Sequence, residues 1–356
     1  MKFIYWFAYY NTDSPSVRYR GQYPLQYLKA RQGINSFFIT PSYNPVNIIR
    51  FLRAYFSALL FTKTGSIIVI QRVNSNFIYA NLLKVLVKFR KKHTIYDLDD
   101  ADYLEYPDNT INYFLRNCTA VTAGSKELFN YFSSFNDFVI LNTSPTPDLK
   151  IIKQQRNDLF TIGWIGGFGG AHRISLLKYF FPSLINFPFK VKLVLLGVKN
   201  KADQEFLLKY FSTFENVILD IPVNIDWKNE SNIQQRLAGF DVGIATLLNT
   251  EAQRAKSAFK LKQYLNNGVP VLSTNIAENN VFIEQGVNGY FCNTPDDFRN
   301  RLLEIYSMDN TRYGILSENA RRSIGNFDHR NYIKGLESFY LGNSVAIPQL
   351  KDTACL

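Results

Sequence analysis

The sequence predicts an α/β protein built from two open domains in tandem, each with a mainly parallel sheet. Its 356 residues exceed the usual length of a single domain. The composition, 46% hydrophobic and 19% charged, is that of a globular protein. Short apolar runs alternate with segments of helical periodicity through both halves of the chain. That alternation is typical of parallel strands joined by helices.

The first half is predicted to hold six strands with helices between them. The expected strands are 3–10, 36–40, 66–72, 94–100, 120–124 and 138–143. The expected helices are 22–32, 47–61, 77–92 and 124–134. A polar, proline-bearing segment follows at 142–158 and is typical of a linker. We therefore place the domain boundary between residues 150 and 151.

The second half repeats the pattern. The expected strands are 159–167, 191–197, 216–222, 241–246, 269–274 and 289–293. The expected helices are 173–181, 202–213, 231–238, 257–267 and 295–307. In open α/β sheets, ligands bind beyond the carboxyl ends of the strands. The loops that follow the strands are therefore the first places to look for a functional site.

Charge and cysteine usage narrow the class of protein. The net charge is +11, and residues 1–150 contribute +7 of it, with 17 Lys and Arg against 10 Asp and Glu. Such a balance suits nucleic acid, anionic lipid or phosphorylated small molecules. No run of about 18 apolar residues predicts a membrane-spanning helix, and the aromatic-rich N-terminus is typical of a first strand rather than a secretory signal. Three scattered cysteines and three scattered histidines indicate a reduced, cytoplasmic protein without a zinc site.

A glycine-rich loop follows the first strand of the second half. Four of the seven residues 164–170 are Gly, including Gly166 and Gly167. Backbone without side chains can approach a phosphate closely and offer it N–H groups. The G-x-G-x-x-G spacing of a dinucleotide site does not fit, because His172 occupies its last position. The alternative is a flexible turn without a ligand.

Residues 254–271, RAKSAFKLKQYLNNGVPV, gather basic side chains before a Gly-Val-Pro-Val turn. If a helix begins with Ser257 as its N-cap, Lys256 precedes the first turn and Lys260 lies four positions on, so the two share one face. Lysines there oppose the helix dipole, and a bound phosphate would reverse the penalty. An ordinary solvated face is the alternative. Lys262 falls nearer the apolar side and is expected to be structural.

Two polar stretches follow strands in the first half. Asp99 and Asp100 belong to an acidic stretch at 96–106, where carboxylates can hold a metal, act as a base, accept hydrogen bonds from sugar hydroxyls, or simply cap a turn. Arg18 and Arg20 follow the first strand and can bind phosphate or an acidic acceptor, or be plain surface loop residues.

Together these stretches resemble glycosyltransferase family 4, which has the GT-B fold, in its bacterial polysaccharide-assembly form. GWIGG, DVGIATL, RAKSAFKLKQYLNNGVPVLST and IEQGVNGYFC match the donor half of that family, and YDLDDADY and VTAGSKEL match its acceptor half. The resemblance implies two facing Rossmann-like domains and a last helix that crosses back to the first. The implied limits are 1–150 for the acceptor domain, 151–326 for the donor domain, 327–341 for the crossing helix and 342–356 for a tail.

The resemblance also implies a reaction. A sugar would pass from a nucleotide-diphosphate donor to a glycan or lipid-linked acceptor, with retention at the anomeric carbon and without a cofactor or obligatory metal. Basic groups would then hold the charge of the leaving diphosphate. The implied donor-binding residues are Gly166, Gly167, Arg254, Lys256, Lys260, Gln263 and Asn279. Asp99 and Asp100 are the candidate catalytic residues, and Arg18 and Arg20 the candidate acceptor contacts.

The chain departs from that family at three places. Ala255 and Gln263 stand where many members have two glutamates, and the Gln263 amide can still bond a hydroxyl group. Asp99 stands where many members have a histidine. SPSVRYR, which contains Arg18 and Arg20, replaces a Gly-Gly turn.

Other functions stay open at this point. A nucleotide-sugar epimerase of the same fold needs acid and base groups near the donor sugar, for which His172 and Glu278 are the candidates. A non-catalytic nucleotide- or glycan-binding protein would keep only the phosphate site. No basic–aromatic motif of a nucleic-acid binder occurs. Segments 47–63 and 81–93 are apolar helices edged with Arg and Lys, which either lie on an anionic membrane, at its inner face, or pack on the sheet with a basic exposed face.

Overall fold

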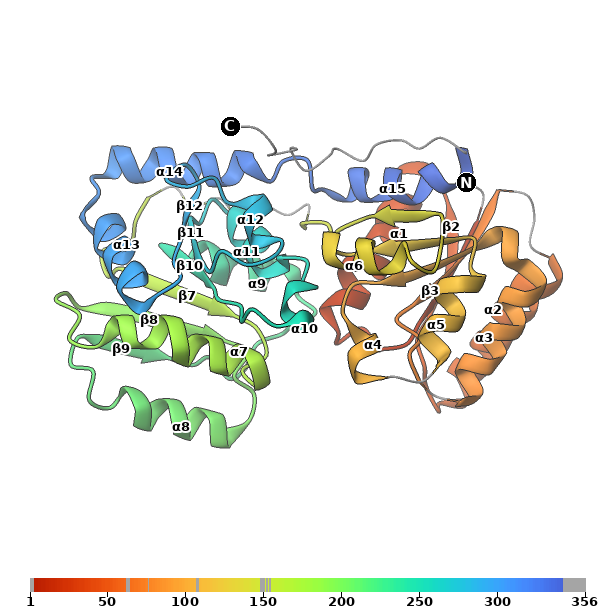
Figure 1. The fold of residues 1–356 in the computed structure, drawn as a ribbon, viewed down its shortest axis with the longest axis horizontal. Coiled ribbons are helices and arrows are strands. Elements are labelled where there is room, and N and C mark those ends of the chain that lie inside the picture. The colour runs from red at the N-terminus through yellow and green to blue at the C-terminus, as the bar shows by residue number, and fades with distance from the viewer. Residues whose placement is uncertain are drawn as a thin grey trace. The chain divides into compact units, whose positions relative to one another are not determined.

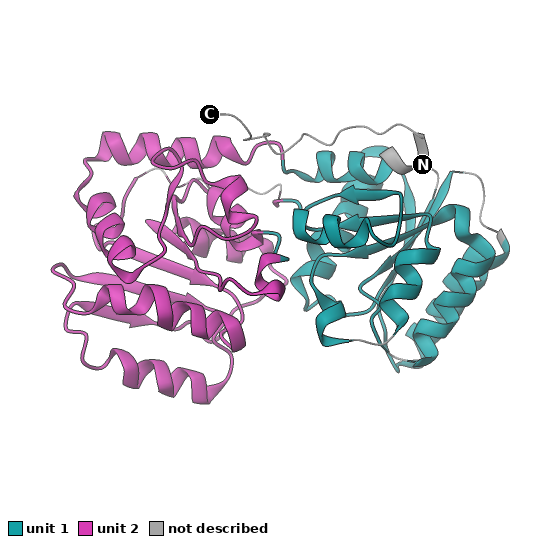
Figure 2. Cartoon of the chain, in the orientation of Figure 1, with its two compact units in different colours: residues 1–145, 255–257, 327–356 teal, residues 146–254, 258–326 magenta. Residues whose placement is uncertain are grey.

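The computed structural model describes residues 3–61, 65–75, 77–106, 109–147, 151, 153 and 155–341. The chain divides into two compact units, drawn in different colours in Figure 2. Unit 1 comprises residues 1–145, 255–257 and 327–356, and unit 2 comprises residues 146–254 and 258–326. Each unit has a six-stranded parallel sheet covered by helices (Figure 1).

The sheet of unit 1 has the strand order β2-β1-β3-β4-β5-β6. Its strands are β1 (Phe3–Ala8), β2 (Asn35–Ile39), β3 (Ser66–Gln71), β4 (Thr94–Leu98), β5 (Ala120–Ala123) and β6 (Val139–Leu141). Its helices are η1 (Val17–Gln22), α1 (Tyr23–Gln32), α2 (Pro45–Phe61), α3 (Phe77–Arg90), η2 (Lys91–His93), α4 (Asp102–Glu105), α5 (Asn109–Asn117), α6 (Lys126–Phe132) and α15 (His329–Leu341).

Two hydrophobic cores hold unit 1 together, one on each face of its sheet. Residues of α2, α3, α5 and α6 form one core with alternate side chains of the strands, and α1 and α15 form the other. Strand β3 is buried along its whole length, which explains the apolar run IIVI within its sequence SIIVIQ. The helix expected at 327–341 begins at His329, and its Tyr332, Ile333 and Leu336 pack in the core of unit 1.

The sheet of unit 2 has the strand order β12-β11-β10-β7-β8-β9. Its strands are β7 (Thr161–Ile165), β8 (Val191–Leu196), β9 (Val217–Asp220), β10 (Val242–Ala245), β11 (Val271–Ser273) and β12 (Gly289–Phe291). Its helices are α7 (Gly170–Ser175), η3 (Leu176–Phe180), η4 (Phe181–Leu184), α8 (Lys201–Phe211), α9 (Glu230–Ala238), α10 (Glu251–Arg254), α11 (Phe259–Asn266), α12 (Asn279–Phe282), α13 (Pro295–Ser307) and α14 (Asn310–Ser323).

Every predicted strand is present, and the expected helices are found with small shifts at their ends. The predicted start of one helix was wrong. Ser257 is not an N-cap, because residues 255–257 belong to unit 1 and α11 begins only after Ala258. Ala258 adopts a left-handed conformation with φ +50°, which turns the chain into the helix. The helices that were not predicted include η1, α4, α5, α10, α12 and α14. Among the described residues, no helix is both long and apolar enough to cross a bilayer.

Candidate functional site

The glycine loop of unit 2 leaves the end of β7 in a conformation that depends on two glycines. Gly166 has φ +154°, and its N–H donates to the carbonyl of Leu196 over 2.9 Å. Gly197, at the end of the neighbouring strand, has φ +108°, and a Cβ atom there would lie 2.2 Å from the carbonyl oxygen of Gly166. The ends of β7 and β8 therefore approach each other at a distance that side chains would prevent.

Lys260, from the first turn of α11, lies over this loop. Its ammonium nitrogen is 4.7 Å from the ring centre of Trp164, within the range of a cation–π contact. A Cβ atom on Gly166 would lie 2.6 Å from the same nitrogen. The structure therefore brings together Lys260 and Gly166, two residues that the sequence predicted for one site from distant parts of the chain.

Tyr264 fixes α11 on the sheet beneath Lys260. Its buried hydroxyl accepts a hydrogen bond from the N–H of Ile165 over 2.9 Å and donates to the carbonyl of Ile244 over 3.3 Å. Burial raises the pKa of Tyr264, so the hydroxyl stays protonated and can donate. Its ring fills the space over Gly243, where a Cβ atom would come within 2.5 Å. Tyr264 was not predicted from the sequence, although it lies four residues after Lys260 on the same helix.

The space beside the loop is open at Gly167, where a Cβ atom would meet no atom within 4 Å. The other predicted donor-side residues have internal contacts. The guanidinium of Arg254 donates to Asn249 Oδ1 over 3.2 Å, and Gln263 is buried on α11. The buried amide of Asn279 donates to two carbonyls at the ends of β10 and β11, 3.2 and 3.3 Å away.

Lys262 and the two residues considered for an epimerase are also placed. Lys262 is fully buried, with its ammonium nitrogen 5.3 Å from the ring centre of Phe282, as expected for a structural residue. The ring of His172, on α7, lies 6.5 Å from that of Trp164 between centres, and Glu278 is buried directly before α12.

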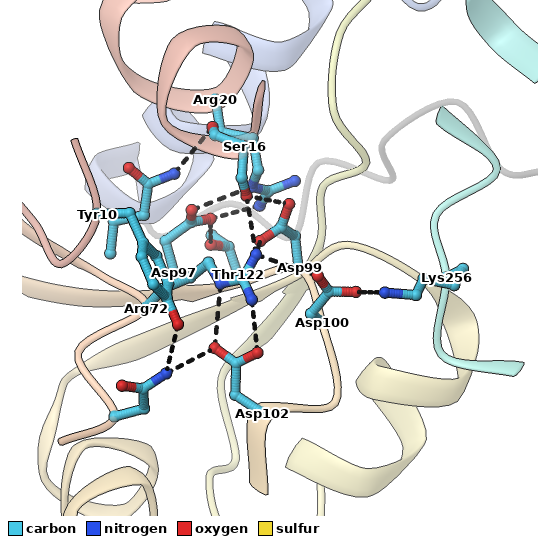
Figure 3. Close-up of polar contacts among 12 residues, drawn as sticks. Tyr10, Ser16, Arg20, Arg72, Asp97, Asp99, Asp100, Asp102, Thr122 and Lys256 are labelled. Atoms are coloured by element: carbon cyan, nitrogen blue, oxygen red, sulfur yellow. Dashed lines mark hydrogen bonds and ion pairs between the residues drawn. The ribbon is translucent and has the colours of Figure 1, made fainter. Parts of the chain in front are cut away.

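Lys256 does not share a helix face with Lys260, and that expectation was wrong. The segment that contains it belongs to unit 1, where the hydroxyl of Ser125 donates to the carbonyl of Ala255 over 2.8 Å. The ammonium group of Lys256 pairs with Asp100 Oδ1 at 2.6 Å (Figure 3). The physical reason is that residues 255–257 are part of unit 1, and the chain turns into α11 only after them.

Arg72, which was not predicted from the sequence, is the centre of an ion network at the carboxyl ends of β3 and β4 (Figure 3). It binds both oxygens of Asp102, over 3.0 and 2.6 Å. Its Nη1 lies 3.1 Å from a carboxylate oxygen of Asp100 and 3.6 Å from one of Asp99. Burial opposes the positive charge of Arg72, but the three carboxylates hold its pKa well above the ordinary value.

Two carboxylates of this network have pKa values shifted in opposite directions. Burial disfavours a charged Asp100, but Arg72 and Lys256 outweigh it and lower the pKa of Asp100. For Asp102, the effect of burial exceeds the opposite effect of Arg72, and the pKa of Asp102 is raised. Asp99 lies just after the end of β4. Its Oδ2 atom accepts a hydrogen bond from the hydroxyl group of Ser16 over 2.5 Å. The Oδ1 atom of Asp99 is buried and makes no hydrogen bond, and the Nη1 atom of Arg72 lies 3.6 Å from it.

Arg18 and Arg20 are buried in the first helical turn, η1, and not exposed in a loop. The Arg20 guanidinium pairs with Asp97 over 3.0 Å, donates to the carbonyl of Asn142 over 2.6 Å and lies 5.5 Å from the ring centre of Tyr332. Arg18 Nη1 donates to two carbonyls of the preceding turn, at 2.7 and 3.0 Å. The alternative of plain surface loop residues is wrong for both, and their contact with an acceptor stays a prediction.

The acidic side chains of this network pair with basic side chains. Among the residues that the structure describes, no three or more His, Cys, Asp or Glu side chains are grouped so as to hold a metal ion. The Asp100 and Asp102 carboxylates, which the sequence left open as ligands, are instead paired with Arg72 and Lys256.

The two units, each with a parallel six-stranded sheet, define a fold of the GT-B glycosyltransferase type. Solved structures with this fold align along the whole chain at low sequence identity. Sucrose-phosphate synthase from Thermosynechococcus elongatus has a TM-score of 0.68 and 12% identity, covering 96% of this chain and 99% of its own. Anabaena HepE, solved with UDP and glucose, has a TM-score of 0.64 and 13% identity, covering 96% and 100%. The lipopolysaccharide outer core galactosyltransferase WaaB has a TM-score of 0.61 and 14% identity, covering 96% and 99%. No protein-family model matches this sequence, and no curated protein matches it either.

Proposed function

We propose that this protein is a retaining glycosyltransferase of family 4 that moves a sugar from a nucleotide-diphosphate donor to a glycan or lipid-linked acceptor in cell-surface polysaccharide synthesis. The observation that supports it most is the ammonium group of Lys260 above the glycine loop at the end of β7, within a GT-B fold. HepE, which has the same fold, has been solved with UDP-glucose and with UDP.

The chemistry assigned to this site is stabilisation of the leaving diphosphate. Breaking the sugar–phosphate bond places extra negative charge on the diphosphate, and a fixed cation with free backbone N–H groups lowers the energy of that state. Lys260 supplies the cation, and the open space beside Gly167 admits the phosphate. Because a protein cation takes this role, the reaction needs no metal or other cofactor. Arg254, Lys256, Gln263 and Asn279 stay predicted donor contacts.

On the acceptor side, we assign Asp99 the contact with the hydroxyl group that receives the sugar. Its Oδ1 atom makes no hydrogen bond and lies 3.6 Å from Arg72 Nη1, while Oδ2 is fixed by Ser16. Asp100 is paired with Arg72 and Lys256, so its proposed part in catalysis is to hold these cations beside Asp99. The proposed acceptor is a carbohydrate at the inner, cytoplasmic face of the membrane, not a nucleic acid.

Donor turnover tests the proposal directly. The protein is incubated with UDP-, GDP- and dTDP-sugars, and released nucleoside diphosphate is measured with and without EDTA. We expect release from at least one donor, unaffected by EDTA and faster with an acceptor oligosaccharide whose product retains its anomeric configuration. Binding of a donor without any release, with or without acceptor, would instead make the protein a nucleotide-sugar binder.

A pair of glycine variants tests the position of the phosphate. Gly167→Ala adds a methyl group that meets nothing in the described protein, so its stability is expected to stay unchanged. The methyl group would occupy the space assigned to the phosphate, and donor affinity is therefore expected to fall about tenfold. Gly314→Ala, in α14, also meets nothing and is the matched control. Equal donor affinity in both variants would show that the phosphate binds elsewhere.

A further inference from the structure

Helix α2 is apolar on the side that faces solvent as well as on the side that packs against the sheet. Its buried positions include Ala54, Tyr55 and Ala58. Several of its large aliphatic and aromatic residues nevertheless lie in solvent, with Ile49 67% exposed, Phe56 50% and Leu60 58%. A helix that only covers a sheet buries its large apolar residues and exposes polar ones. The sequence of α2 is therefore adapted to a second apolar environment.

The exposed apolar residues of α2 form one continuous stripe. Ile49, Leu52, Phe56 and Leu60 are spaced three, four and four residues apart, which places them along one face of the helix. Val46 and Tyr43 extend the stripe beyond its start, and both are exposed. Single exposed apolar residues are ordinary, but a contiguous patch of this length marks an interaction surface.

Helix α3 extends the patch. It packs against α2, as the ring contact of Phe51 with Tyr79, 5.5 Å between centres, shows, and the two helices lie side by side in Figure 1. The Arg90 guanidinium donates to the carbonyl of Leu59 over 2.6 Å, which joins the ends of the helices. Outward from α3 point Ile78, Val85 and Phe89, at spacings of seven and four residues. We call these exposed residues of α2 and α3 the apolar face.

The stretch of chain that carries the apolar face has charges of one sign. Residues 14–96 contain 13 Lys and Arg and no Asp or Glu. Arg50 and Arg53 are exposed on α2, and Lys88, Lys91 and Lys92 are exposed at the end of α3 and in η2. A second copy of this chain would present the same cations, so two such faces would repel each other. The surface that complements apolar side chains edged with cations is an anionic lipid bilayer.

We infer that the apolar face binds the surface of an anionic phospholipid bilayer, with the side chains of α2 and α3 inserted between the headgroups and the cations against the phosphates. The helices lie on the membrane and do not cross it. This inference does not depend on the proposed reaction, because it concerns the surface of unit 1 and is tested without a nucleotide sugar.

The first test is co-sedimentation of the full chain with vesicles. Vesicles containing phosphatidylglycerol are compared with pure phosphatidylcholine vesicles, at low and at high salt. We expect binding to the phosphatidylglycerol vesicles that weakens as salt rises, because the Debye length shortens. Absence of binding at low salt, or equal binding to both kinds of vesicle, would overturn the inference.

Three double variants assign the binding to the apolar face. Ile49→Ser with Phe56→Ser removes exposed apolar surface and should weaken binding at least about tenfold. Arg50→Gln with Arg53→Gln should weaken it about fivefold for each cation removed. Leu208→Ser with Lys209→Gln, on α8 of unit 2, removes an exposed apolar residue and an exposed cation elsewhere and should bind as the wild type does. If the first variant binds as tightly as the control, the face is not the membrane site.

Two further measurements distinguish a lipid surface from a second copy of the chain. A tryptophan in the Phe56→Trp variant should shift its emission to the blue on vesicles and be quenched by brominated lipid, whereas one in Leu208→Trp should not. Sedimentation velocity should give a monomer for the wild type and the Ile49→Ser/Phe56→Ser variant alike; a wild-type dimer that the variant dissociates would assign the face to a second copy. Donor affinity is measured for each variant and should not change, so a failure of membrane binding is distinguishable from a failure of the proposed reaction.

Discussion

The carboxyl ends of the two sheets are built in contrasting ways. In unit 1, this edge holds Arg72 among Asp99, Asp100 and Asp102, with Lys256 at its side, and the opposite charges pair with one another (Figure 3). In unit 2, the corresponding edge holds the glycine loop, with the ammonium group of Lys260 over the ring of Trp164.

The contrast indicates two kinds of function. Buried opposite charges cost desolvation, which their attraction only partly offsets, so a network such as that of Arg72 fixes an arrangement of groups more than it adds stability. A cation placed over backbone and an aromatic ring, beside open space, instead leaves room for an anion. Under the proposed function, the network of unit 1 would contact a neutral acceptor, and the glycine loop of unit 2 would bind a charged donor.

The largest effect is expected from breaking the network of unit 1. Arg72→Met leaves three carboxylates without their central cation, and the free energy of unfolding should fall by about 3–5 kcal/mol. Urea unfolding measures the change. The matched control is Lys192→Met in unit 2, which breaks an ion pair whose side chains are each 37% exposed and should cost less than about 1 kcal/mol. Equal losses in the two variants would remove the distinction between the units.

The next effect concerns the lysine of unit 2. Lys260→Ala removes a charge-assisted contact to the diphosphate and should weaken donor binding by about 2 kcal/mol, roughly 30-fold. Titration calorimetry with the donor found in the turnover assay measures it. Lys209→Ala, an exposed lysine on α8, is the control and should bind normally. Unchanged affinity in Lys260→Ala would mean that the phosphate assignment is wrong.

The pH dependence of the free energy of unfolding tests the ion network of unit 1 separately. The pKa of Asp100 is lowered in the folded protein, so its contribution is present above the unfolded pKa of about 3.9 and is lost as the pH falls through the folded value. Asp100→Asn should therefore cost about 2 kcal/mol near neutral pH and progressively less below about pH 4.

Asp102 is expected to behave with the opposite sign. Its pKa is raised, so its contribution is complete below the unfolded pKa and is lost as the pH rises through the folded value. Unfolding of Asp100→Asn and Asp102→Asn across this pH range compares the two carboxyl groups. Parallel pH profiles for both variants would contradict the arrangement around Arg72.

The smallest difference between the two units is expected in the reactivity of their buried cysteines. Cys118 in unit 1 and Cys292 in unit 2 are both buried, and burial raises the pKa of each thiol to about 12. At pH 8 each should hold less than about a thousandth of the thiolate of an ordinary cysteine, whose pKa is about 8.5. Iodoacetamide labelling followed by peptide mapping should modify both only after unfolding in urea. Rapid labelling of one in the native protein would show that its unit opens.

The sequence was sufficient to predict features set by local pattern. Short apolar runs predict the strands, and ligands of a parallel sheet bind beyond the carboxyl ends of its strands. The position of the glycine loop and of Lys260 near such an end could therefore be predicted from the sequence. The network around Arg72 could not, because its partners lie 27 to 30 positions along the chain and meet only through the pairing of β3 with β4. The same holds for Arg20, whose partner Asp97 is 77 residues away.

Two local features also escaped prediction. Ala258 takes a left-handed conformation that Gly or Asn usually adopts, and nothing in its sequence context signals it. Residues 255–257 pack in unit 1 although the chain on both sides belongs to unit 2, so helical spacing placed Lys256 beside Lys260 when it lies beside Asp100. Helical periodicity describes a continuous helix and contains no information about where a chain leaves its own domain.

Hydrogen–deuterium exchange with and without UDP-glucose tests the central claim most directly, because it reports which unit takes the nucleotide. We predict slower exchange in peptides that cover residues 164–170 and 258–266, and no change in the α8 peptide that covers residues 201–211. The same experiment on Lys260→Ala should lose that protection at matched ligand concentration. Protection confined to residues 96–106 of unit 1, with none at the glycine loop, would contradict the claim.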